Sequence, residues 1–143
     1  MRILALARII KIMSKKKIID VFIPDGYKPK KVEREAAWVL ARHYKTTVRI
    51  LRPTMGYQEK TPDFVVNEMR YELKTPTSAK VKKIEWLIRD ASKQSENVVL
   101  DGRKTKIHEK RLIEICKDRL KHIKKVRKII LITSERKVLD FIK

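Results

Sequence analysis

An aspartate, a glutamate and a lysine near the middle of the chain have residue types and a spacing that suit hydrolytic chemistry. Glu72 and Lys74 lie two residues apart in the segment 69–74, and side chains two apart on a β-strand project from the same face. Asp63 begins the preceding apolar segment, and Asn67-Glu68 between the two segments predicts a tight turn. An antiparallel hairpin would therefore bring Asp63, Glu72 and Lys74 together at one edge of a sheet.

These three side chains can hold a metal ion and act on a phosphate. Two adjacent carboxylates repel one another and bind a hard divalent cation such as Mg²⁺ through oxygen. A lysine beside them can orient or deprotonate a water molecule, or stabilise charge on a phosphate in the transition state. The arrangement indicates phosphodiester hydrolysis. The alternative is an exposed strand that carries an ordinary Glu–Lys pair across its pleat.

The composition predicts a folded domain with a strongly positive surface. The chain has 143 residues, 43% of them hydrophobic, with 3 glycines and 5 prolines, which excludes collagen-like and low-complexity classes. Lysine and arginine number 37 against 17 acidic residues, so the formal net charge is +20. A polyphosphate is the commonest partner of such a surface, although charge alone leaves DNA, RNA and an anionic membrane open. The single cysteine, Cys116, cannot form an internal disulfide, which fits a reducing compartment.

The elements that must position the three side chains follow from hydrophobic periodicity, which predicts one α/β domain over residues 1–143. Helices are expected at 31–44, 81–91 and 112–123, and strands at 18–23, 47–51, 63–66, 69–74, 97–100 and 128–133, with a strand or helix at 138–142. The central order is helix, three strands, helix, strand, which predicts a mixed sheet with helices on both faces. His43, Trp38 and Trp86 are expected to pack in the core, with base stacking as the alternative for the tryptophans.

Residues 1–17 are expected to form an extension ahead of this core. They are apolar but interrupted by Arg2, Arg8 and Lys11, which favours an amphipathic helix that is too short and too charged to cross a bilayer. The segment also lacks the uncharged core and cleavage site of a signal peptide. We therefore expect a cytoplasmic protein that does not bind a membrane.

Several motifs in this order of elements resemble the PD-(D/E)XK nuclease superfamily. They are Glu33-Arg-Glu35 on the first core helix, Thr61-Pro-Asp63, Tyr71-Glu72-Leu-Lys74, and Lys93-Gln94 followed by the strand that ends at Asp101. Within the superfamily, residues 30–135 are most similar to the tRNA nuclease domains at the C-termini of contact-dependent-inhibition toxins of the CdiA type. The resemblance implies a restriction-endonuclease-like αβββαβ core, with a mixed central sheet flanked by helices.

The same resemblance implies a role for each residue of the hairpin site. Asp63 and Glu72 would be ligands of Mg²⁺, or of Mn²⁺ in its place, and Lys74 would be the water-positioning residue or general base. A glutamate of the first core helix would complete the site. Glu33 and Glu35 both fit, and Glu33 is preferred because archaeal Holliday-junction resolvases share an E-R-E opening at that position. Gln94, at the edge of the apolar face of the second core helix, would support the lysine or a phosphate, with an ordinary polar boundary residue as the alternative.

A dense run of cations is expected to follow the phosphate backbone of a nucleic acid. Residues 103–128 contain twelve lysines and arginines and three acids, although a charge run is often only a solvated helix face. No helix-turn-helix pattern or aromatic RNA-binding motif is visible, so base-specific recognition is not predicted. The expected nucleic-acid-binding residues are Lys80, Lys82, Lys83, Arg103, Lys110, Lys117 and Lys121.

Three hypotheses of function follow. The first is a metal-dependent endonuclease that cleaves tRNA or another structured RNA, with toxin-like activity and an acidic immunity protein as the partner that the resemblance implies. The second is a DNA-directed nuclease of the same superfamily, such as a Holliday-junction resolvase or a restriction-like enzyme. The third is a nucleic-acid-binding module without catalysis, which has no evident use for clustered carboxylates facing an anionic ligand.

Overall fold

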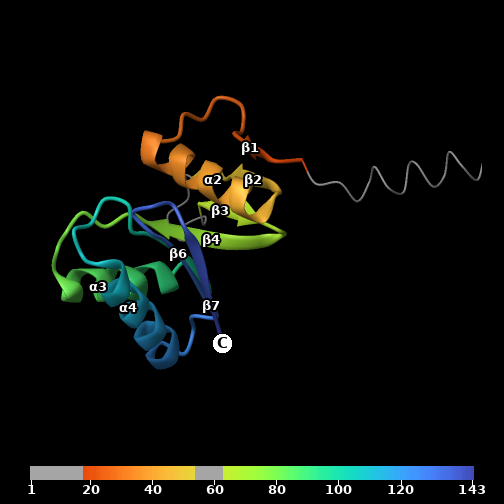
Figure 1. The fold of residues 1–143 in the computed structure, drawn as a ribbon. Helices are drawn as coiled ribbons and strands as arrows, with labels where there is room; N and C mark the ends of the chain where they lie inside the picture. Colours follow the sequence, from red (N-terminus) through yellow and green to blue (C-terminus); the bar gives the residue numbers. More distant parts are fainter. Residues whose placement is uncertain (1–17, 54–62) are drawn as a thin grey trace, which may run out of the picture.

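The structure is a computed structural model that describes residues 18–53 and 63–143. The predicted N-terminal extension, and Thr61 and Pro62 of the motif before Asp63, lie outside the described residues. The elements, labelled in Figure 1, are β1 (Asp20–Phe22), α2 (Lys31–Tyr44), β2 (Thr47–Ile50), β3 (Phe64–Val66), β4 (Met69–Lys74), α3 (Val81–Ser92), β5 (Asn97–Asp101), α4 (Glu109–His122), β6 (Lys128–Ile132) and β7 (Val138–Ile142).

The described strands form one mixed sheet in which spatial order follows chain order, from β1 to β7. β1 pairs parallel with β2, and β2, β3 and β4 pair antiparallel in succession. β4, β5 and β6 are parallel, and β7 returns antiparallel to β6. The predicted α/β class and the order helix, three strands, helix, strand are confirmed. The segment 138–142, for which the sequence allows a strand or a helix, is a strand.

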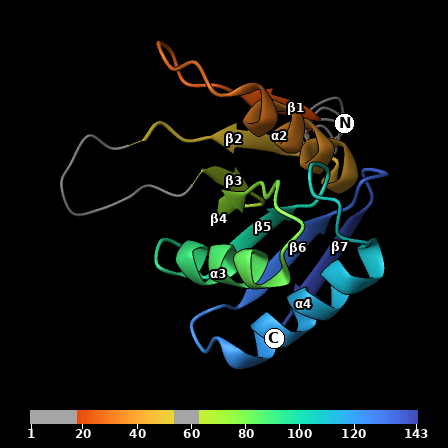
Figure 2. The ribbon, with the colours of Figure 1, turned by 90° about the vertical axis from the view of Figure 1, so that its left-hand side faces the viewer.

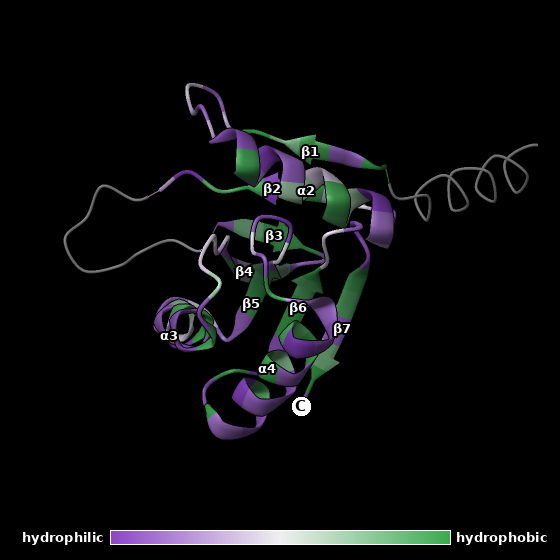
Figure 3. Ribbon diagram, turned by 60° about the vertical axis from the view of Figure 1, so that its left-hand side comes forward, coloured by the Kyte–Doolittle hydropathy of each residue, from purple (hydrophilic) through white to green (hydrophobic). Residues whose placement is uncertain are grey.

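Helices lie on both faces of the sheet (Figure 2), and an apolar cluster lies on each face. α2 packs on one face against β1, β2 and β3, whereas α3 and α4 lie on the other face, α3 against β4 and β5 and α4 against β6 and β7. Leu40, Phe64 and Leu73 belong to the first cluster, and Ile88 and Leu100 belong to the second. Figure 3 shows the hydrophobic central strands between helices whose outer sides are hydrophilic. Alternation along β4 therefore directs Tyr71 and Leu73 toward α2, and Glu72 and Lys74 toward the opposite face.

Helix ends lie where side chains or backbone conformation stop the helical hydrogen bonding. At the start of α2 the carboxylate of Glu33 accepts a hydrogen bond from the Lys30 N–H at 3.0 Å, which satisfies a donor at the helix start. Lys45 ends the helix in the left-handed region at φ 52°. α4 starts after His108, whose Nδ1 accepts from the Lys110 N–H at 3.1 Å.

The expectation that His43, Trp38 and Trp86 pack in the core was wrong. All three are exposed, and Trp86 has an exposed fraction of 52%. The apolar face of α2 continues from Leu40 to Tyr44 rather than to His43. Each tryptophan instead lies beneath a cation, since the Arg42 guanidinium lies 5.4 Å from the Trp38 ring and the Lys83 ammonium 4.5 Å from the Trp86 ring.

Candidate active site

Asp63 and Glu72 lie directly opposite each other on the β3–β4 hairpin. The pairing of Phe64 with Tyr71 and of Val66 with Met69 places Asp63 across from Glu72 in the same register. The Asp63 carboxylate also accepts a hydrogen bond from the Leu73 N–H at 2.8 Å. The two carboxyl groups are hydrogen bonded to each other. The predicted juxtaposition of Asp63 and Glu72 is therefore present in the structure.

Glu72 is more buried than its place near the end of a strand suggests. A strand end predicts light packing, but the exposed fraction of Glu72 is 4%. Burial, followed by the hydrogen bond to Asp63 and the negative charge of Asp63, raises the pKa of Glu72 to about 9, and the positive charge of Lys74 partly opposes this shift. Without a cation, Glu72 is therefore protonated at neutral pH and hydrogen bonded to Asp63.

This raised pKa predicts that the metal-free protein becomes less stable as the pH rises. Between the pKa of an unfolded glutamate, about 4.3, and that of folded Glu72, about 9, the folded state binds one more proton than the unfolded state. The free energy of unfolding must then fall with increasing pH, by up to about 1.4 kcal/mol per pH unit from this group. Urea unfolding in EDTA at several pH values between these limits measures the slope.

The matched variants for this measurement are Glu72→Gln and Glu85→Gln. Glutamine at position 72 keeps a hydrogen-bonding side chain of the same size but cannot titrate, so the slope should become flatter. Glu85 is a partly exposed glutamate of α3, so its variant should keep the slope of the original protein. If the free energy of unfolding of Glu72→Gln and of the wild-type protein fell equally with pH, the result would contradict a protonated Glu72.

Lys74 has a partner that the sequence analysis missed. Its ammonium donates to Asp90 of α3 at 2.8 Å, and both side chains are mostly buried. The charges of both Lys74 and Asp90 act on Glu72, so the three groups form one electrostatic cluster. The ammonium has three N–H donors, and the one used for Asp90 leaves two for a water molecule or a phosphate oxygen. The sequence carries no signal for this contact, because Asp90 lies on a helix distant from Lys74 along the chain.

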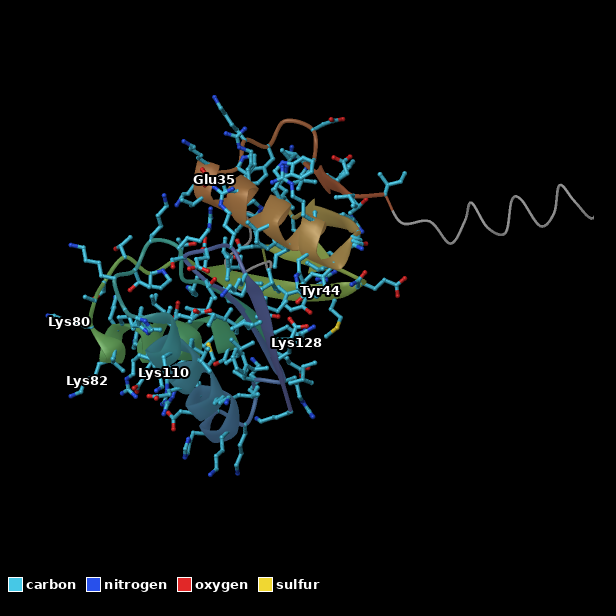
Figure 4. All side chains as sticks on the ribbon, in the orientation of Figure 1. Glu35, Tyr44, Lys80, Lys82, Lys110 and Lys128 are labelled. Carbon is cyan, nitrogen blue, oxygen red and sulfur yellow. The ribbon has the colours of Figure 1, made fainter. Side chains whose placement is uncertain are left out.

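The structure separates the two glutamates of α2. Glu33 accepts a hydrogen bond from the Tyr27 hydroxyl at 3.3 Å. Burial, the charge and hydrogen bond of Glu33, and the charge of Asp63 raise the pKa of Tyr27. Glu33 and Asp63 therefore both lie near the Tyr27 hydroxyl. Glu35 instead pairs with Arg103 at 2.9 Å, on the part of α2 marked in Figure 4. The arrangement favours Glu33 over Glu35 as the additional acid of the site.

Arg103 is not placed to contact phosphates, which corrects its assignment to the nucleic-acid-binding set. The exposed fraction of its side chain is 7%, and its guanidinium pairs with Asp101, which has an exposed fraction of 0%, at 2.7 Å. The remaining guanidinium contacts are the Glu35 carboxylate and the Val32 carbonyl oxygen. Because these partners come from α2 and from the end of β5, Arg103 connects the helix to the sheet.

Gln94 lies in the turn that follows α3, not on the helix face where it was predicted. α3 ends at Ser92, and the Gln94 N–H donates to the Ala91 carbonyl in the turn that follows. In the same turn, the Ser95 hydroxyl donates to the Arg70 carbonyl at 3.0 Å, which places this segment toward the start of β4 rather than its end. The role of Gln94 in supporting Lys74 or a phosphate stays a prediction, and Asp90 is the residue that contacts the lysine.

The six lysines of the predicted nucleic-acid-binding set are exposed. Other cations of residues 103–128 already contact neighbouring side chains. Arg119 pairs with Asp118 at 2.7 Å, and Lys128 lies over the rings of Tyr44 and Tyr71 at 5.7 and 5.6 Å. Figure 4 labels three of the exposed lysines on the α3–α4 side of the molecule. The exposed members are Lys80, Lys82, Lys83, Lys110, Lys117 and Lys121.

The donor set at the hairpin fits a Mg²⁺ or Mn²⁺ ion completed by water and substrate. Asp63 and Glu72 bring two carboxyl groups together, and a bound cation would offset the repulsion between their negative charges. Within residues 18–53 and 63–143, no group of three or more His, Cys, Asp or Glu side chains is arranged to hold a metal ion. Mg²⁺ typically takes one or two carboxylates and fills its remaining positions with water and substrate phosphates, so two carboxylates are sufficient.

The fold and the site define an α/β domain with a carboxylate pair and a lysine on an antiparallel hairpin. Over the described residues, no helix is long and apolar enough to cross a membrane. The sequence model of the contact-dependent growth inhibition CdiA C-terminal domain matches residues 60–138, more than half of the chain and the whole of the hairpin. The chain therefore belongs to the family of contact-dependent growth inhibition CdiA C-terminal domains.

A solved structure has the same fold. A chain of the CdiA-CT/CdiI toxin and immunity complex from Burkholderia pseudomallei superposes with a TM-score of 0.62 at 14% sequence identity, over 87% of this chain and 99% of that chain. No curated protein matches the sequence. The similarity at this level of identity concerns the fold, and the chemistry of the site is argued from its own residues.

Proposed function

We propose that this CdiA C-terminal domain is a toxin that acts as a metal-dependent endonuclease of the PD-(D/E)XK type, with tRNA or another structured RNA as its substrate. The observation that carries the proposal is the opposed carboxyl pair of Asp63 and Glu72, with the ammonium of Lys74 beside it. A protein that only binds nucleic acid has no use for two carboxylates directed at an anionic ligand.

Each residue of the site has a distinct role in this proposal. Asp63 and Glu72 hold Mg²⁺ or Mn²⁺, which when bound supplies Lewis-acid activation of the phosphate and of water. Lys74 orients the attacking water and stabilises charge on the phosphate, and Asp90 positions the lysine through their ion pair. Glu33, held by Tyr27, completes the acidic side of the site.

RNA is favoured over DNA as the substrate by the similarity of the sequence motifs to tRNA nuclease domains. The net charge of +20 supports binding to either nucleic acid. The exposed lysines at the start of α3 and on α4 would contact the phosphate backbone; they are Lys80, Lys82, Lys83, Lys110, Lys117 and Lys121. A DNA-directed nuclease with the same site is the second candidate.

An acidic immunity protein is the proposed protein partner. The similar solved chain comes from a toxin and immunity complex. A partner protein of opposite charge would associate rapidly with a surface of charge +20 and would also compete with nucleic acid for it.

Incubation with total tRNA and with plasmid DNA, each in Mg²⁺, in Mn²⁺ and in EDTA, tests the proposed function. We expect cleavage of tRNA that requires the divalent cation. Cleavage of plasmid alone would favour the DNA-directed nuclease. Binding of both nucleic acids without cleavage under any of the conditions would contradict the enzymatic proposal and support a binding module.

A further inference from the structure

A concave pocket of about 710 Å³ lies on the sheet face opposite α2, beyond the carboxyl pair. β2, β3 and the start of β4 form its floor. α3 packs against β4 and β5, and α4 against β6 and β7 (Figure 2), so neither of these two described helices packs mainly on β2 or β3. The pocket is lined by Thr46, Thr47, Arg49, Leu51, Val65, Asn67, Glu68 and Arg70.

Arg49 and Arg70 flank Val65 at the base of the pocket. Arg49 pairs with Val65 in the β2–β3 ladder, and Val65 pairs with Arg70 in the β3–β4 ladder. All three side chains therefore project from one face at one level. The two arginine Cα atoms are separated by two strand spacings, about 10 Å. Both arginines are exposed, and within the described part of the chain neither guanidinium group has a hydrogen bond or an ion pair.

The residue types of the pocket suit an anion with several phosphates. A guanidinium binds a phosphate through two parallel N–H···O bonds, and both guanidinium groups are available for this geometry. Glu68, at the β3–β4 turn, brings one negative charge against the two positive charges, so the lining remains net positive. An apolar ligand would leave both arginines desolvated without a partner.

The pocket lies next to the candidate active site along β4, although Asp63, Glu72 and Lys74 do not line it. Arg70 and Glu72 lie two residues apart on β4, so they project from the same face at a separation of about 7 Å along the strand. Lys74 follows on that face after the same interval. A phosphate held by Arg70 would therefore lie next to the carboxyl pair.

We propose that Arg49 and Arg70 form a binding subsite for the sugar–phosphate backbone of RNA, next to the cleavage position. This inference deepens the proposed nuclease function and rests on it for the identity of the substrate. It assigns the nearest phosphate contacts to the open face of β2–β4, and the exposed lysines of α3 and α4 then contact more distant parts of the same RNA.

Binding rather than cleavage tests the subsite. The affinity for labelled tRNA is measured against salt concentration in EDTA, in a Lys74→Ala background with and without Arg49→Gln and Arg70→Gln. We expect the double substitution to weaken binding by at least about tenfold. The slope of log K against log salt should become shallower by about 0.7–0.9 for each phosphate that the variant no longer neutralises.

The matched control is Arg34→Gln with Arg42→Gln, which removes the same charge from the exposed side of α2, on the other face of the sheet. It should change affinity much less than the pocket substitutions. Arg49→Lys with Arg70→Lys should restore most of the salt slope, because it restores the charges. Equal effects of the pocket and control substitutions, or a lysine variant as weak as the glutamine variant, would overturn the inference.

These experiments distinguish failure of the proposed arginine subsite from failure of the proposed nuclease function. Loss of affinity on substitution of the two arginines in a protein that cleaves no nucleic acid would support the subsite and contradict the nuclease. Cation-dependent cleavage with an unchanged affinity of the arginine variant would support the nuclease and overturn the subsite. Thermal unfolding of each variant confirms that it is folded, as expected for exposed substitutions.

Discussion

Glu72→Gln and Lys74→Ala are each expected to lower the rate of RNA cleavage by about 10²–10⁴-fold, the usual contribution of a catalytic acid–base or electrostatic group. Glu72→Gln removes the charge that a cation requires while keeping the shape of a buried side chain. Lys74→Ala removes the ammonium beside the carboxyl pair. Single-turnover cleavage of labelled tRNA in Mg²⁺ measures the loss, and binding of the same RNA in EDTA should remain nearly unchanged.

The chain offers a second Glu-x-Lys pair as the control for this experiment. Glu135 and Lys137 form an ion pair of 3.3 Å at the β6–β7 turn, and both side chains are exposed. Glu135→Gln and Lys137→Ala should cleave at the original rate. If Glu72→Gln and Lys74→Ala did so as well, the β3–β4 hairpin could not be the catalytic site.

Asp90 provides a finer test of how Lys74 is held. If Asp90 acts only by positioning the Lys74 ammonium, Asp90→Asn should slow cleavage in the original protein but cause no further loss in the Lys74→Ala background. Additive losses would indicate that Asp90 acts independently of the lysine.

The hairpin could be predicted from the sequence because its register depends on local residues. Asn67 and Glu68 both have positive φ, 48° and 68°, which is the conformation of a two-residue turn whose twist matches its strands. Such a turn fixes the pairing of the flanking strands, and Asp63 must then oppose Glu72. The helices were equally predictable, since the apolar spacing of α2 and α4 matches their buried faces.

The partners of the site residues could not be predicted, because they come from elements distant in the sequence. The contact between Lys74 and Asp90 depends on how α3 packs against β4. The choice between Glu33 and Glu35 depends on Tyr27 and Arg103, which lie in loops before α2 and after β5. Periodicity describes which face of a helix is apolar. It does not indicate which polar residue of another element a given side chain of the helix will contact.

The position of Gln94 illustrates a related limit. The helix expected at 81–91 ends at Ser92, where the Ser92 hydroxyl donates to the Arg89 carbonyl. Gln94 is nevertheless predicted at the edge of the helix face, although it follows the last helical residue. A serine that bonds to its own helix backbone competes with the helical pattern. A side chain two residues past the end of a helix lies in the following turn, here the turn before β5, and not on the helix face.

Arg103→Met is expected to lower the free energy of unfolding by about 3–5 kcal/mol, the usual cost of removing one partner of a buried ion pair. The reason is that Asp101 has an exposed fraction of 0% and would be left without the guanidinium that bonds to both of its carboxylate oxygens. Urea unfolding measures the change as a lower midpoint with an unchanged slope. A change of less than about 1 kcal/mol would mean that the ion pair carries little of the stability.

The comparison that isolates the pair is the double substitution Asp101→Leu with Arg103→Met. Apolar side chains can replace a buried ion pair with little loss, so the double variant should be more stable than Arg103→Met alone.

Since Arg103 also contacts Glu35 and the Val32 carbonyl of α2, the single variant should loosen the start of the helix that carries Glu33, and its cleavage rate should fall. Its RNA affinity should keep the original salt dependence, because a buried arginine paired with two acids releases no counterion from RNA. A shallower salt slope for Arg103→Met would instead indicate that Arg103 contacts an RNA phosphate. Its ion pairs with Asp101 and Glu35 would then have to break when RNA binds.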